Sequence, residues 1–118
     1  MNLFQVFDYS GEGYHSVLIG KSWQVAYLNH DTIFSAPQEI ERHNHTDEAF
    51  VLLEGNANLL GYNINGEISF MPMKFGKIYN VPAGVWHTIQ TFPGCKCLII
   101  ENSNTHLHDV QRKTITSL

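Results

Sequence analysis

Two histidines separated by one residue are the first feature of this sequence that could do chemistry. His43 and His45 would share one face of a β-strand, because residues i and i+2 of a strand point to the same side. Two imidazoles directed into a cavity can bind a metal, although a fixed geometry needs a third donor. The pair alone is equally consistent with two exposed histidines at a strand end. In a chain with seven histidines the same spacing also recurs at His106 and His108.

A second segment places a histidine within a longer and more specific sequence pattern. It follows the pattern Gly-x5-Pro-x-Gly-x2-His, with Gly76, Pro82, Gly84 and His87 at the defined positions. Pro82 and Gly84 favour a tight turn, which would reverse the chain and place His87 at the start of an inward-facing strand. The first segment also contains Glu48, which stands seven residues before Gly55. With these two motifs the chain resembles the cupin superfamily.

The resemblance implies a fold, a ligand set and a cofactor. The fold is an all-β double-stranded β-helix, the jelly-roll cupin barrel. The implied metal ligands are His43, His45 and His87, joined by Glu48 as a fourth ligand or as a catalytic base beside the metal. Such donors suit a divalent transition metal, which could be Fe, Mn, Ni, Cu, Co or Zn.

The spacing between His45 and Glu48 departs from the family pattern. Only Thr46 and Asp47 separate them, where cupins usually have three or four residues. If the turn absorbs the missing residue, Glu48 points inward. If the strand slips by one residue, Glu48 points outward and leaves Asp47 or water in its place. We expect the inward orientation, because a turn adjusts at a smaller cost than a strand whose side chains all change face.

The remaining sequence predicts strands throughout one domain, residues 1–118. Segments with alternating or β-branched residues and turn signals lie at 14–20, 22–28, 49–55, 56–64, 67–71, 78–82, 86–92 and 95–102, with a short strand within 29–37. Asn65-Gly66 predicts a two-residue hairpin turn with both residues at positive φ. Residues 103–118 fit a strand, a loop or a short helix. His15, His30, His106 and His108 belong to no motif, so we expect them at the surface.

Composition excludes several classes of partner. The net charge is −4, and the seven lysines and arginines form no run, so neither nucleic acid nor a membrane surface is expected as a partner. No apolar run is long enough to span a bilayer, and the N-terminus lacks the pattern of a secretory signal. Cys95 and Cys97 are poorly placed for a disulfide, which favours reduced thiols and a cytoplasmic location.

Three functions remain open at this point. The first is a metal-dependent enzyme acting on a small organic molecule, of the dioxygenase, isomerase or lyase type. The second is a non-catalytic module that binds a small ligand or a metal. The third, a metal-free isomerase, is disfavoured by the complete set of His43, His45 and His87. Segments 49–55 and 97–101 carry apolar residues on both strand faces, which predicts a homodimer.

Overall fold

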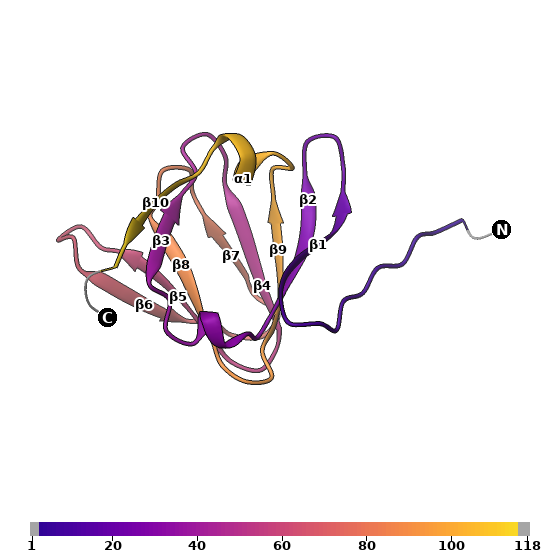
Figure 1. Ribbon diagram of the computed structural model, residues 1–118, viewed down its shortest axis with the longest axis horizontal. Coiled ribbons are helices and arrows are strands. Elements are labelled where there is room, and N and C mark those ends of the chain that lie inside the picture. The colour runs from indigo at the N-terminus through magenta and orange to yellow at the C-terminus, as the bar shows by residue number, and fades with distance from the viewer. Residues whose placement is uncertain (1–2, 116–118) are drawn as a thin grey trace.

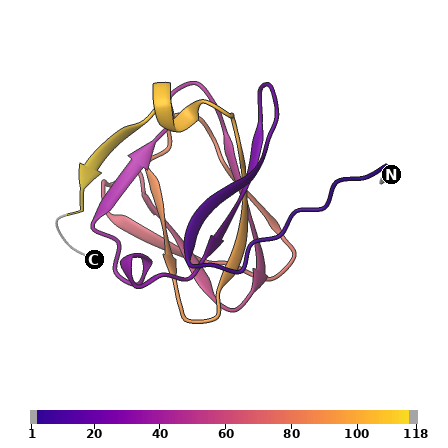
Figure 2. The same cartoon turned by 45° about the vertical axis from the view of Figure 1, so that its right-hand side comes forward.

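Two antiparallel five-stranded sheets pack face to face in the computed structural model, which describes residues 3–115 (Figures 1 and 2). The first sheet has the order β1 (Gly13–Ile19), β2 (Gln24–Asn29), β9 (Lys96–Glu101), β4 (Glu48–Glu54) and β7 (Ile78–Val81). The second has the order β10 (Gln111–Thr114), β3 (Glu39–Arg42), β8 (His87–Thr91), β5 (Ala57–Tyr62) and β6 (Ile68–Pro72). This is the all-β sandwich that the sequence predicts.

Most strands follow the predicted segments, although β3 lies outside them and β10 lies in the segment 103–118 that the sequence left open. The alternation of side chains along the strands fills the space between the sheets. Along β8 the residues His87, Ile89 and Thr91 are buried, while Thr88 and Gln90 are half-buried. Strand β4 buries Glu48, Phe50 and Leu52 in the same alternating manner. The core between the sheets is therefore apolar at its centre, with buried polar groups around Glu48, His87 and Glu101.

Two local predictions were wrong. Segment 29–37 forms a 3-10 helix, η1 (Thr32–Phe34), because the Asp31 carboxylate accepts a hydrogen bond from Ile33 N and caps it. The hairpin between β5 and β6 is present, but only Gly66 takes a positive φ, of 76°, and Asn65 does not. The Asn63 side chain instead accepts hydrogen bonds from Asn65 N and Glu67 N, which organises a longer turn.

The C-terminal segment closes one end of the sandwich. A short helix, α1 (Thr105–His108), crosses between β9 and β10, and β10 then pairs with β3 at the edge of the second sheet (Figure 1). This arrangement brings His106 and Asp109 next to the residues around His43. Among the described residues no helix is long and apolar enough to cross a membrane.

Candidate metal centre

His43 lies directly after β3 and is oriented by the C-terminal segment. Its Nδ1 is 2.8 Å from the carbonyl oxygen of Asp109, so the ring donates its Nδ1–H there. Its Nε2 lies 3.1 Å from Oε2 of Glu48, and the residue is only 2% exposed. A backbone carbonyl thus fixes the orientation of this ring and directs Nε2 at a buried carboxylate.

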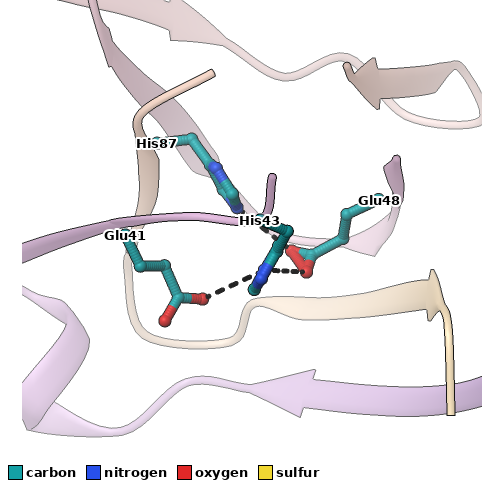
Figure 3. A group of neighbouring side chains, drawn as sticks. All are labelled: Glu41, His43, Glu48 and His87. Carbon is teal, nitrogen blue, oxygen red and sulfur yellow. Dashed lines mark hydrogen bonds and ion pairs between the residues drawn. The ribbon is translucent and has the colours of Figure 1, made fainter. Parts of the chain in front are cut away.

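His87 is oriented in the same way by the predicted turn. Gly84 has a φ of 87° and donates its N–H to the carbonyl of His43, which joins the two segments. The Nδ1–H of His87 is donated to the carbonyl of Val85 over 2.9 Å. Its Nε2 lies 3.3 Å from Oε1 of Glu48. Both imidazoles therefore direct Nε2 at the same carboxyl group, one toward each oxygen (Figure 3).

Glu48 and Glu41 complete the group. Glu48 is 4% exposed and points inward from the start of β4, which confirms the orientation expected from the sequence. The turn at residues 43–47 accommodates the spacing that is one residue shorter than in the family pattern. Asp47 does not replace Glu48, because the Asp47 carboxylate accepts hydrogen bonds from Ala83 N and Asn80. Oε1 of Glu41 lies 3.7 Å from Nε2 of His43. The possible donor atoms of Glu41, His43, Glu48 and His87 all lie within 4.8 Å of one another.

The structure does not bring His45 into this group. The expectation that His43 and His45 share a strand face is wrong, because β3 ends at Arg42 and residues 43–47 form a turn. The side chain of His45 is exposed. Its backbone N–H and that of Asn44 are donated to the carboxylate of Asp109, which holds the turn in this conformation.

The charges around Glu48 depend on one another. Burial alone would raise the pKa of Glu48, but hydrogen bonds with His43, His87 and Glu101 outweigh it and hold the pKa well below its ordinary value. Burial alone would lower the pKa of His43, but the hydrogen bonds to Glu48 and to the Asp109 carbonyl, together with the charges of Glu48 and Glu41, outweigh it and raise the pKa to about 9. Burial would likewise lower the pKa of His87, but the hydrogen bond and charge of Glu48, the hydrogen bond to the Val85 carbonyl and the charge of Glu41 together raise it. The group therefore consists of imidazoles that ion-pair with a carboxylate when no metal is present.

This donor set fits a divalent transition metal. Histidines that bind metals commonly donate their second ring N–H to a carbonyl, and both His43 and His87 do so. The nitrogen left with a lone pair in each neutral ring is Nε2, the atom directed at Glu48. Two imidazoles and two carboxylates suit Fe, Mn, Ni, Cu, Co or Zn, and binding would displace the protons that now connect the rings to Glu48.

A second polar cluster lies beside the first, and sequence reasoning missed it. Oε1 of Glu101 accepts hydrogen bonds from Tyr14 and Gln24, and lies 2.9 Å from Nε2 of His106. The prediction that His106 is a surface residue was wrong, because α1 turns it toward Glu101. His30, also expected at the surface, is half-buried, and its Nδ1 lies 2.8 Å from the hydroxyl of Thr91. No motif contains Glu41 or Glu101, and only their cross-strand partners His87 and Glu48 could have indicated them.

A cavity of about 340 Å³ opens beside these groups. Apolar side chains form much of its wall, among them Leu28, Phe34, Phe50, Ile89 and Ile99. His87 and Glu41 of the first cluster, and Glu101 and His106 of the second, also line it. A small molecule in this cavity would thus contact both polar clusters, while its apolar part packs against the apolar side chains of the wall.

Solved structures with the same architecture are cupins. A cupin-2 domain protein from Shewanella frigidimarina has a TM-score of 0.59 and 21% identity, covering 80% of this chain and 84% of that chain. An RmlC-like cupin with a double-stranded β-helix fold, from Methanocaldococcus jannaschii, has a TM-score of 0.63 and 11% identity, covering 87% and 94%. The chain therefore has the fold of a small cupin.

Oxalate decarboxylase from Bacillus subtilis, described with Mn(II) centres, is also similar in structure. Its TM-score is 0.59 at 14% identity, and the match covers 85% of this chain but only 28% of the decarboxylase. No protein-family model and no curated protein matches the chain. At these identities the similarity establishes the fold, and the chemistry must be argued from the site.

The pH dependence of stability tests the ion pairs around Glu48. In metal-free protein, the raised pKa of His43 stabilises the fold. This contribution is fully present below pH 6.5, the ordinary pKa of histidine, and is lost as the pH rises through about 9. The lowered pKa of Glu48 adds stability above 4.5 that is lost as the pH falls. We therefore expect the free energy of unfolding, measured by urea denaturation with a chelator, to fall between pH 6.5 and 9. In Glu48→Gln the decrease should be smaller, and an identical decrease would contradict these ion pairs.

Proposed function

We propose that this chain is a metal-dependent cupin enzyme that acts on a small organic molecule, through a reaction of the dioxygenase, isomerase or lyase type. The observation that carries the proposal is the convergence of Nε2 of His43 and Nε2 of His87 on the Glu48 carboxylate. Each ring is locked by a backbone carbonyl, and the group adjoins a cavity of ligand size. Glu41 lies beside these three residues, with Oε1 3.7 Å from Nε2 of His43, and His45 has no part in the site.

The protein residues would divide the work between binding and positioning. A divalent metal bound here supplies Lewis acidity, or open positions for substrate and oxygen. His43, His87 and Glu48 hold the metal, and Asp109 and Val85 keep the two rings in place through their carbonyls. The apolar side of the cavity, including Phe50 and Ile99, excludes water around the substrate. A free oxygen of Glu48 or Glu41 could accept a proton from a substrate held in the cavity.

Elemental analysis followed by an activity screen tests this function. Protein purified without chelator is expected to contain one equivalent of a transition metal per chain. After the metal is removed and reloaded, the protein should turn over a small substrate. His87→Ala should neither retain the metal nor turn over the substrate. A chain that binds metal without turnover across the screened carbonyl, sugar and acid substrates would favour a non-catalytic binding module. Absence of metal binding after reconstitution would contradict the proposal.

The state of the cysteines supports a reducing compartment such as the cytoplasm as the place of function. Cys95 and Cys97 are free and buried, and their sulfur atoms lie 3.6 Å apart without a bond. Disulfides persist mainly in oxidising compartments, so two neighbouring free thiols are typical of a reducing one. Thiol counting on protein from fresh lysate should find both free, and an oxidised pair would contradict this assignment.

We also propose that the protein is a homodimer. The N-terminal segment extends away from the sheets (Figures 1 and 2) and exposes Leu3, Phe4 and Val6 by 87%, 82% and 91%. Exposed apolar side chains in one short segment are typical of a protein contact. We expect sedimentation to give twice the chain mass of 13.4 kDa at micromolar concentration. A mass of one chain would contradict the dimer, and deletion of residues 1–7 should weaken it if this segment contributes.

A further inference from the structure

Arg112 is the one arginine or lysine that lines the cavity. It lies in β10, where adjacent side chains point to opposite faces of the sheet. Its neighbours face outward: Gln111 accepts a hydrogen bond from Arg42, and Lys113 lies over the rings of Tyr62 and Trp86. Of these three residues, strand alternation therefore directs only Arg112 toward the cavity and the polar clusters.

The guanidinium of Arg112 has unused donors. Its Nε lies 3.4 Å from Oε2 of Glu41, its partner across the β10–β3 pair. Within residues 3–115, no hydrogen bond of the structure engages its two Nη groups. The side chain is also about half exposed, at 49%, so this ion pair with Glu41 is weak, and a ligand can replace Glu41 as the partner of Arg112. An arginine whose two Nη groups are free can bind a planar carboxylate through two parallel hydrogen bonds.

Metal binding would leave Arg112 without a counter-charge. Glu41 belongs both to this ion pair and to the group with His43, Glu48 and His87. A divalent cation in that group neutralises the charges of Glu41 and Glu48. Glu101 is already held by hydrogen bonds from Tyr14 and Gln24 and by its contact with His106. Glu101 has His106 as its own partner, so Arg112 is then the cation of the cavity wall whose carboxylate partner is taken up by the metal.

From these observations we propose that Arg112 is the anchor for a small monocarboxylate with an apolar body. The carboxylate pairs with Arg112 beside the metal centre, because Arg112 contacts Glu41 of that group, and the apolar body packs against Leu28, Phe34 and Ile99. A cavity of 340 Å³ is near the lower end of the range for ligand sites, which limits the ligand to a compact molecule. This inference deepens the proposed function and rests on it.

Calorimetry with matched acids and amides tests the anchor. Zinc-loaded protein is titrated with 4-methylpentanoate and 3-phenylpropanoate, with the amide of each, and with inorganic phosphate. We expect the carboxylates to bind about 10- to 100-fold more tightly than their amides, the effect of a hydrogen-bonded charge. Arg112→Met should remove this preference. Arg42→Met, which changes an arginine on the outer face, should keep it.

Several results would overturn the anchor. Equal binding of acids and amides, no binding of any probe at millimolar concentration, or a preference that survives in Arg112→Met would each do so. Arg112-dependent binding of phosphate that matches the carboxylates would overturn the assigned ligand class. Zinc content, measured on the same samples, separates this inference from the proposed function. One zinc per chain without a carboxylate preference refutes only the anchor. An Arg112-dependent preference in protein that holds no zinc contradicts the metal centre of the proposed function, and with it the premise that a metal releases Arg112 from Glu41.

Discussion

Replacing His43 or His87 by alanine is expected to weaken the binding of a divalent transition metal by at least about tenfold. Losing a residue that only hydrogen-bonds to a metal ligand already weakens metal binding by about this factor. Replacing His45 by alanine should leave the affinity unchanged. The reason is geometric: Nε2 of His43 and of His87 lie 3.1 and 3.3 Å from Glu48, whereas the His45 side chain is exposed on the turn at residues 43–47. Competition against a chromophoric chelator measures all three affinities on the same scale.

His45→Ala is the matched control for His43→Ala, since both remove one imidazole from the same short segment. Circular dichroism and thermal unfolding establish that each variant is folded. A His45→Ala variant that loses affinity as strongly as His43→Ala would contradict the donor set. It would mean that the turn rearranges on metal binding and restores the spacing expected from the cupin motif.

The second large effect concerns Glu48 in metal-free protein. Glu48→Ala is expected to lower the free energy of unfolding near pH 6 by about 3–5 kcal/mol, the usual cost of removing one partner of a buried ion pair. The variant leaves His43 and His87 buried, 2% and 4% exposed, without the carboxylate that stabilises their protonated forms. Urea denaturation in the presence of a chelator measures the change.

Glu54→Ala provides the comparison, because Glu54 lies at the other end of β4 and is exposed. Its expected effect is within about 0.5 kcal/mol, as for most surface substitutions. A loss below about 1 kcal/mol for Glu48→Ala would contradict the ion-pair network, since even a single unsatisfied buried group usually costs more.

Sequence reasoning predicted the fold and part of the site. Strand alternation and the turn at Pro82 and Gly84 were sufficient to place His87 at the start of an inward-facing strand. The inward orientation of Glu48 could also be predicted, because a slipped β4 would have exposed Phe50 and Leu52. These predictions succeeded because each depends on a local pattern with a period of two residues.

The errors arose where tertiary contacts decide the structure. His45 was expected on a strand, but β3 ends at Arg42, and Asp109, more than sixty residues away, holds the following turn. Glu41 enters the group through its pairing with β8 and β10. His106 reaches Glu101 through α1, in a segment whose sequence fits a strand, a loop or a helix. None of these contacts has a signal in the local sequence.

The contribution of the C-terminal segment has a functional consequence. The Asp109 carbonyl orients His43, the Asp109 carboxylate holds the turn that follows, and Arg112 lines the cavity. The metal centre that we propose is therefore assembled from the two motif segments and from residues 105–112 together. Its geometry depends on the pairing of β10 with β3.

A crystal structure of metal-loaded protein, with anomalous diffraction at the absorption edge of the metal, tests the central claim most directly. We predict one anomalous peak per chain, bonded to Nε2 of His43, Nε2 of His87 and the Glu48 carboxylate, at about 2.0–2.2 Å if the metal is zinc. His45 should remain in solvent. A peak coordinated by His45, or a loaded protein in which His43 and His87 still contact Glu48 with no metal between them, would contradict the account.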